Sequence, residues 1–320
     1  DLHRANSATI VDYDREVFMK DFLYDAIMDT ENGYSLSYEI LKDYAPTGSV
    51  ADIPAEKLAE MNSRLDALAQ VSNRKQIEDY LLRNAFKQQH NISLSGGNEK
   101  VKYYLSGSFI GGHSSYVGDQ DREFYLNSRT SYKLNSFLTL RADLNATFTD
   151  NDNGYTSLSS DVYSLYPFQP LVDAQGNRVY DYSTTFSHAY SDQIVNDYGY
   201  HHLGKNLIEE VELANNRTKG TDIKARLGAD FKIMDGLSIS ADYQYEKYQT
   251  TTRDLTDMNS YAGRHDIDWF ASVDDNKQLV YNVPNEDFLD QSQTTAEAWI
   301  LKLGANLNRS FGAAQYQYLQ

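Results

Sequence analysis

The sequence predicts an all-β transmembrane barrel whose extracellular loops carry helical insertions. Apolar and polar residues alternate over runs of about 11 to 14 residues, whereas strands of globular sheets usually have roughly 5 or 6. Very short turns and long polar loops follow one another along the chain, as they do at the two ends of an outer-membrane barrel. All five prolines fall outside the predicted strands, where a missing amide donor does no harm. Since about 9 to 11 tilted residues cross a bilayer as a strand, these runs are long enough to span a membrane.

The first 88 residues differ from the rest and predict helices. Apolar residues recur there at helical spacing, with charged residues between them. The two stripes are Val17, Phe18, Phe22, Leu23, Ala26 and Ile27, and then Leu58, Met61, Leu65 and Leu68. Pro54 stands just before the second stripe, where a helix commonly starts. We therefore expect residues 1–88 to be an extracellular helical loop segment that packs through these stripes.

From residue 89 onward the period changes to two, and residues 89–320 are predicted to be part of a barrel. The predicted strands are 89–95, 100–109, 122–134, 138–148, 222–233, 237–245 and 295–308, with an eighth that starts at Ser310-Phe311-Gly312. Tight turns are expected at Gly96-Gly97-Asn98-Glu99, Asn135-Ser136 and Asp235-Gly236, whose residue types suit them. Long extracellular loops are expected at 110–121, 150–220 and 249–293. In the clearest strand, 138–148, the even-numbered residues are apolar and the odd-numbered ones polar.

The composition argues against one class of function, nucleic-acid binding, and is compatible with a barrel. The 46 acidic and 29 basic residues give a formal net charge of −17, which argues against nucleic-acid binding because phosphate contacts need clustered Lys and Arg. The mean hydropathy of −0.61 does not argue against a barrel, since only every second strand residue faces lipid. The 26 tyrosines suit strands in general, but they also suit aromatic girdles and a ligand-contacting surface. The chain begins at Asp1 without a charged leader, which predicts a mature or truncated product.

Two groups of residues are candidates for function. Aromatic and histidine side chains of the 150–220 loop are expected to face a substrate or a partner: Tyr163, Tyr166, Tyr180, Tyr182, Tyr190, Tyr198, Tyr200, His201 and His202. Polar residues on the strands are expected to face the barrel lumen: Arg141, Asp143, Asn145, Lys224, Arg226, Asp230 and Asp242.

No motif predicts catalysis, so we do not expect an enzyme. His201-His202 lies near Glu209, Glu210 and Glu212, but adjacent histidines usually point apart, and a metal site is the weaker interpretation. Residues 150–154 place oxygen ligands at alternate positions before a glycine, as calcium loops do, yet lack the bidentate glutamate at the twelfth position. A solvated turn is favoured over loop-bound calcium, and no other cofactor is expected.

Residues 85–97, AFKQQHNISLSGG, followed by Tyr103-Tyr104-Leu105-Ser106, resemble the second-strand signature of the SusC/RagA family of TonB-linked outer-membrane transporters. The resemblance continues in Asp121-Arg122 to Leu140, in Met234-Asp235-Gly236-Leu237, and in Ser260-Tyr261 and Arg264. It covers roughly residues 75 to 312 in organisation, with about thirty specific positions.

The resemblance implies a portion of a large antiparallel barrel of about 22 strands in the bacterial outer membrane. It also implies import of oligosaccharides or peptides together with a SusD-like surface lipoprotein. No segment resembles the plug, the TonB box or the last strands, so contact with the TonB complex would belong to a missing N-terminal part.

Two other interpretations stay open. A barrel could anchor ligand-gripping loops as a surface binding protein or adhesin, without active transport. The chain could instead be a soluble β-rich glycan-binding module, which would stay monodisperse without detergent.

Overall fold

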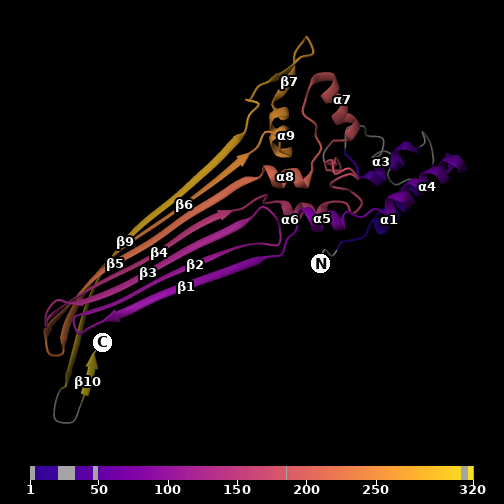
Figure 1. Cartoon of the computed structure of the whole chain (residues 1–320). Coiled ribbons are helices and arrows are strands. Elements are labelled where there is room, and N and C mark those ends of the chain that lie inside the picture. The colour runs from indigo at the N-terminus through magenta and orange to yellow at the C-terminus, as the bar shows by residue number, and fades with distance from the viewer. Residues whose placement is uncertain (1–3, 21–32, 46–49, 185, 311–315, 320) are drawn as a thin grey trace.

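The computed structural model describes residues 4–20, 33–45, 50–184, 186–310 and 316–319, with the backbone alone after residue 308. Its main feature is one long antiparallel sheet, which has eight strands in the described part of the chain, with helices gathered at one end (Figure 1). The strands of this sheet are β1 (Phe86–Gly97), β2 (Val101–His113), β3 (Gln120–Lys133), β4 (Leu138–Asp152), β5 (Asn215–Met234), β6 (Leu237–Thr256), β9 (Phe288–Ser310) and β10 (Tyr316–Leu319). A separate short hairpin pairs β7 (Ala271–Val273) with β8 (Leu279–Tyr281).

The seven strands predicted between residues 89 and 308 are present, and neighbours pair in the order β1-β2-β3-β4-β5-β6-β9-β10. The eighth was predicted to start at Ser310-Phe311-Gly312, but Ser310 ends β9 and residues 311–315 lie outside the described residues. Short connections at 98–100, 134–137 and 235–236 lie at the end of the sheet opposite the helices (Figure 1). Longer connections at 114–119, 153–214 and 257–287 lie at the helical end. The alternation of short turns and long loops is therefore confirmed, since antiparallel pairing puts odd and even connections at opposite ends.

The predicted loop bounds were too wide. β6 continues to Thr256 and β9 begins at Phe288, so the strands extend well into the segment predicted as the 249–293 loop. Likewise β5 starts at Asn215, and the first long connection shrinks from 110–121 to 114–119. The reason is that both faces are polar in these extensions, so no apolar alternation marks them. They are held by backbone pairing to their neighbours and by β-favouring threonines such as Thr250, Thr251 and Thr252.

The register places the apolar sides of successive strands on one face. Residues paired directly across strands share a face, and the paired positions on one side of the sheet are overwhelmingly apolar. They include Leu94, Leu105, Phe109, Phe124, Leu126, Leu140, Phe148, Leu227, Phe231, Ile239, Tyr243, Leu301 and Leu303. Many are exposed, among them Ile92 at 76% and Leu303 at 74%. In the middle of the sheet the opposite face carries charged residues, among them Arg141, Asp143, Arg226 and Asp230, so the two faces differ sharply in polarity there.

The sheet is open within the described residues, because β1 and β10 form its two edges and each pairs with a single neighbour. A mostly antiparallel sheet with a few helices is therefore shown, and a closed barrel is not.

Helices cover the end of the sheet that carries the long connections. They are α1 (Ser7–Met19), α3 (Leu36–Asp43), the 3-10 turn η1 (Val50–Asp52), α4 (Ala55–Ala69), α5 (Arg74–Tyr80), α6 (Leu158–Ser164), α7 (His188–Tyr198), α8 (Leu207–Leu213) and α9 (Tyr261–Trp269). The predicted stripe of Met61 and Leu65 is buried in α4, while Phe22, Leu23, Ala26 and Ile27 lie outside the described residues. None of the described helices is long and apolar enough to cross a membrane.

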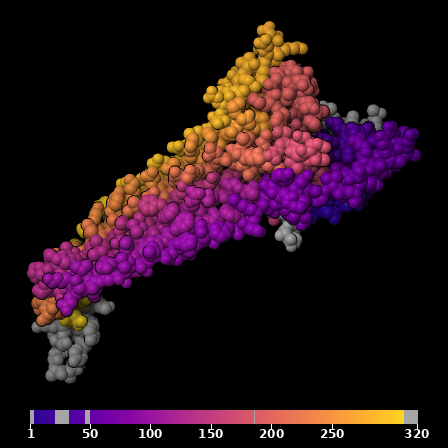
Figure 2. Space-filling view, viewed as in Figure 1, coloured from indigo at the N-terminus to yellow at the C-terminus, as the bar shows by residue number. Residues whose placement is uncertain are grey.

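Two apolar clusters join the N-terminal helices to the 153–214 connection. One is formed by Ile77, Leu81, Leu158, Val162, Leu165, Leu171, Val172, Leu207 and Ile208. The other is formed by Val11, Phe18, Leu41, Val50, Met61, Leu65 and Phe168. Segments far apart in sequence thus share cores, and in the space-filling view they form one continuous mass at the end of the sheet (Figure 2). We call this mass the helical cap.

Candidate functional site

The helical cap contains a cleft of about 360 Å³ between α7 and α9, which we call the aromatic cleft. Its lining is mostly aromatic, with a few polar groups. The lining residues are Phe186, Tyr190, Ile194, Tyr198, Tyr200, Leu203, His265, Asp268, Trp269 and Val273.

One wall of the cleft follows from the spacing within α7. Tyr190, Ile194 and Tyr198 are four residues apart, so they lie along one side of the helix. Ser187 caps the helix, its side chain accepting the Tyr190 amide at 3.1 Å. Gly199 ends it in the left-handed conformation, with φ 84°, which a glycine adopts without strain. Tyr200 follows this turn and returns to the same wall.

The other wall comes from α9. Ser260 caps this helix by accepting the Gly263 amide at 3.0 Å. His265 and Trp269 are one turn apart and stack with ring centroids 6.0 Å from each other. The Trp269 residue is 73% exposed, so its indole offers a broad aromatic surface at the edge of the cleft.

The carboxylate of Asp268 lines the cleft, and His201 lies directly beside it. His201 Nδ1 lies 2.8 Å from Asp268 Oδ1, and the His201 amide donates to Asp268 Oδ2 at 2.9 Å. Burial raises the pKa of Asp268, and the contact with His201 opposes that rise. The carboxylate side chain is only 8% exposed. Asp268 therefore gives the cleft a polar group within a mostly aromatic lining.

Arg264 anchors α9 to the segment that follows α7, and it is 5% exposed. It donates to the carbonyl oxygens of His202 at 3.2 Å and Gly204 at 2.7 Å, and it pairs with Glu209 at 3.4 Å. Because a buried guanidinium must have its donors satisfied, this residue ties α9 to the 201–209 segment.

A half-buried lysine, Lys205, lies near the same region. Lys205 Nζ lies 2.8 Å from Asp161 and between the rings of Tyr155 and Tyr261, at 5.6 and 5.7 Å from their centroids. Burial lowers the pKa of Lys205, but the hydrogen bonds to Asp161 and Tyr155 outweigh it and raise the pKa to about 12.

The cleft gathers three of the sequence-predicted residues, Tyr190, Tyr198 and Tyr200, and a fourth, His201, contacts the lining residue Asp268. The remaining candidates lie elsewhere. Tyr163 is an exposed residue of α6, and Tyr166 stacks on Phe168 in an apolar cluster. Tyr180 donates to Glu209 at 3.2 Å and packs on His202, while Tyr182 stacks on His188.

The histidine and glutamate side chains considered as a metal site contact other residues instead. His201 contacts Asp268 and His202 contacts the ring of Tyr180, so the two imidazoles diverge. Glu210 accepts the Tyr261 amide at 2.7 Å, and Glu212 pairs with Arg178. Among the described residues no group of three metal-ligating side chains occurs.

Residues 150–154 were predicted to be a solvated turn, but the first three of them belong to a strand. Asp150 and Asp152 lie in β4, and Asp150 accepts two hydrogen bonds from Arg217. The strand continues because Asp150 and Asp152 pair with Lys219 and Arg217 of β5.

The residues predicted to face a lumen all lie on the polar face of the sheet. Arg141 pairs with Asp230 at 2.8 Å and with Asp242 at 3.0 Å, and Arg226 pairs with Asp143. Asn145 bonds to Asn127, while Lys224 lies 4.0 Å from Asp222. Whether this face lines a lumen stays a prediction.

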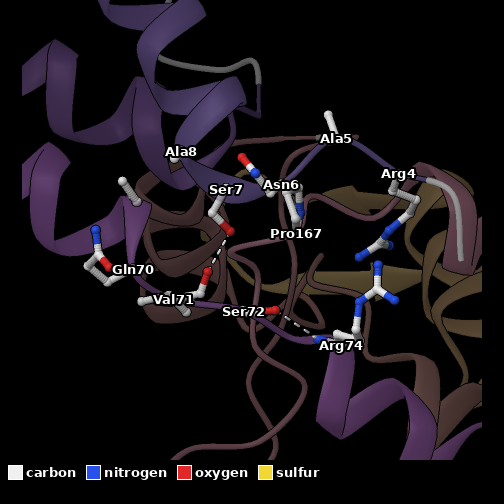
Figure 3. Close-up of a pocket in the computed structure, with 11 residues that line it drawn as sticks. Arg4, Ala5, Asn6, Ser7, Ala8, Gln70, Val71, Ser72, Arg74 and Pro167 are labelled. Atoms are coloured by element: carbon white, nitrogen blue, oxygen red, sulfur yellow. Dashed lines mark hydrogen bonds between the residues drawn. The ribbon is translucent and has the colours of Figure 1, made fainter.

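A second cavity, of about 270 Å³, lies where the first helix meets α5 (Figure 3). Arg4 donates to Leu165 O at 3.0 Å and to Asn73 Oδ1 at 2.7 Å, so it fastens the start of the chain to α5 and α6. Figure 3 shows its guanidinium close to that of Arg74. Burial and, to a smaller extent, Arg74 lower the pKa of Arg4. The contacts of Arg4 indicate a structural clamp.

Sequence reasoning missed Asp268, Trp269, His265 and the anchoring function of Arg264. The only local signal was the spacing of His265 and Trp269 after the capping residue Ser260, which predicts an aromatic pair on a helix.

Comparison with known proteins adds the following. No protein-family model and no curated protein matches the chain. Among solved structures it is similar to the RagAB peptide transporter, with 15% identity, a TM-score of 0.43, and coverage of 57% of this chain and 20% of that chain. The RagAB peptide importer in its closed-closed and open-open states matches with 14% identity, the same coverage, and TM-scores of 0.43 and 0.42. The chain thus spans about a fifth of the length of these transporter chains.

Proposed function

We propose that this chain is part of an outer-membrane nutrient importer of the SusC/RagA type. In this proposal the long sheet is a portion of the wall of a large barrel, and the helical cap lies on the cell exterior. The imported ligand is an oligosaccharide or a peptide, the partner is a SusD-like lipoprotein, and coupling to the TonB complex belongs to a part outside this sequence.

The observation that carries the membrane placement is the alignment of apolar faces across successive strands. Leu227, Leu303 and Trp299 are 63%, 74% and 69% exposed on this face. A soluble monomer seldom exposes so large a contiguous apolar surface. Ten residue steps, as from Leu138 to Phe148 on β4, cover roughly 34 Å along the strand and about 25 Å once tilted, the height of a barrel's apolar band.

The cap supports the transport part of the proposal. The aromatic cleft offers flat rings and a few polar atoms, a combination that suits the faces of sugar rings and the side chains of peptides. The family resemblance in residues 85–106 supports the importer class over an unrelated barrel.

Uptake by cells that carry the full-length protein tests this function. The double variant Tyr198→Ala/Trp269→Ala should reduce uptake of the cognate nutrient roughly tenfold, because two stacking surfaces are lost while the strands are untouched. Tyr163→Ala is the control, since Tyr163 is an exposed aromatic residue of the cap, at 52%, that lies outside the cleft. Surface binding of ligand without energy-dependent uptake would favour the adhesin interpretation. A full-length protein that stays monodisperse without detergent would overturn the membrane placement.

A further inference from the structure

The apolar band has a sharp boundary on the side of the helical cap. Phe109, Phe124 and Phe148 lie side by side on β2, β3 and β4, paired directly across the strands. They form an aromatic row that is the last apolar row on these strands toward the cap. Rows of aromatic residues mark the edges of the apolar band in membrane barrels.

The next row on the same face is charged. Side chains two residues further along a strand stay on the same face, so Arg122, Asp150 and Lys219 follow the aromatic row. One row beyond, Gln120, Asp152, Arg217 and Arg253 are paired across β3, β4, β5 and β6. We name the four basic residues of these two rows, Arg122, Lys219, Arg217 and Arg253, the cationic collar.

The collar has more positive than negative charge. Its four cations are accompanied in these rows by two carboxylates, Asp150 and Asp152, and the bidentate contact with Arg217 already occupies Asp150. Arg122 donates to Gln120 at 2.6 Å, and no described carboxylate forms an ion pair with Arg122, Lys219 or Arg253. All four basic residues are exposed. This excess is opposite in sign to the net charge of −17 of the whole chain.

We propose that the cationic collar binds the phosphate groups of anionic lipid headgroups in the leaflet on the cap side of the membrane. The inference rests on the membrane placement proposed above. The collar starts one row, roughly 7 Å along the strand, beyond the aromatic row, which is the depth at which headgroups meet the apolar band. Basic side chains at that depth attract anionic lipids, each by roughly fivefold in affinity.

The test uses the full-length protein in neutral detergent micelles, titrated with phosphatidic acid and read by native mass spectrometry. Arg122→Gln/Lys219→Gln should weaken lipid binding at least tenfold, and added salt should weaken binding to the unaltered protein. The control Arg129→Gln/Lys232→Gln removes the same charges from the same two strands on the opposite face, and it should leave binding within about twofold.

Three results would overturn the proposal. These are equal losses in the two double variants, equal binding of phosphatidic acid and phosphatidylcholine, and full competition by inorganic phosphate, which would mean a site for the free ion. None of these three results would contradict the membrane placement. That placement is tested separately, by whether the protein inserts into phosphatidylcholine vesicles. Failure to enter vesicles of any composition would overturn both proposals.

Discussion

Arg141 of β4 reaches Asp242 of β6, two strands away, with 3.0 Å between Nη2 and Oδ1. The residue between them in the same row is Gly228 of β5. Since Gly228 has no side chain, the guanidinium can lie over it. A Cβ at this position would clash with the Asp242 carboxylate and lie 3.0 Å from Arg141 Nη2.

Gly228→Ala should therefore abolish the coupling between Arg141 and Asp242. A double-mutant cycle with Arg141→Gln and Asp242→Asn should give about 0.5 to 1 kcal/mol in the parent, because the pair is partly exposed, and about zero in Gly228→Ala. The cycle is measured by urea unfolding of the refolded full-length protein in micelles. The control Gly107→Ala has ordinary space for a methyl group and should be neutral or stabilising by up to about 1 kcal/mol. Unchanged coupling in Gly228→Ala would show that the pair does not depend on the glycine.

A charge on the apolar face should be much more harmful than loss of a charge on the polar face. Leu227→Arg is expected to destabilise by roughly 2 to 4 kcal/mol near the middle of the band. Arg226→Leu should destabilise by about 1 kcal/mol or less, because the Arg226 side chain is largely exposed and such ion pairs contribute little. Folding yields into lipid vesicles compare the two, and equal tolerance would contradict a lipid-facing sheet.

Single cysteines should map the two ends of the sheet, since the chain has no cysteine of its own. Gln175→Cys and Asn276→Cys are exposed in the cap-side connections and should react with a membrane-impermeant reagent on intact cells. Asn135→Cys and Asp235→Cys lie in the tight turns and should react only after permeabilisation. Ser187 is a poor labelling site because it is buried as the cap of α7. Labelling of the tight turns from outside would reverse the topology.

Protonation of His202 should lower the stability of the cap in mild acid. Burial, followed by the charges of Arg264 and His201, lowers the pKa of His202 from 6.5 to about 4. The unfolded chain then binds more protons between about pH 4 and 6.5, so stability falls as the pH is lowered through this window. Thermal unfolding of the cap should show this slope, and His202→Gln should reduce it. The raised pKa values of Asp268 and Glu210 act in the opposite direction, so the comparison is between variant and parent at each pH.

Two turns of the cap have the same construction and differ at one residue. Asp173 and Asp274 each accept the amides two and four residues later, and the amide three residues later donates to their carbonyl oxygens. That third residue has positive φ in both turns: it is Gly176 in the first, with φ 86°, and Lys277 in the second, with φ 61°. Lys277→Gly should stabilise the second turn by about 0.5 to 1 kcal/mol, and Gly176→Lys should destabilise the first by about 1 kcal/mol. Hydrogen exchange of the turn amides measures both, and effects of the same sign would contradict this explanation.

The sequence predicted the sheet well because alternation over ten residues is a strong signal, as residues 138–148 illustrate. It missed the cap-side extensions of β5, β6 and β9, where both faces are polar and only backbone pairing defines the strand. Of the aromatic cleft, the tyrosines of α7 were found because tyrosine is dense in that segment. Trp269 and Asp268 were missed because no local sequence pattern predicts that α9 lies beside α7. The contacts that position α9 are long-range: Arg264 donates to Gly204, and His201 pairs with Asp268.

The shared cores of the helical cap have a consequence for the order of assembly. The hairpins β1-β2 and β3-β4 join neighbours in sequence, so they can form by local pairing. Phe168 packs in the cluster around Val11, and four strands, β1 to β4, lie between these two residues in sequence, so this contact closes a far longer loop. Phe168 can reach that cluster only after β1 to β4 have been laid down between the two segments. Protease resistance of the cap should therefore appear late in biogenesis, as a sign that the wall beneath it is already in place.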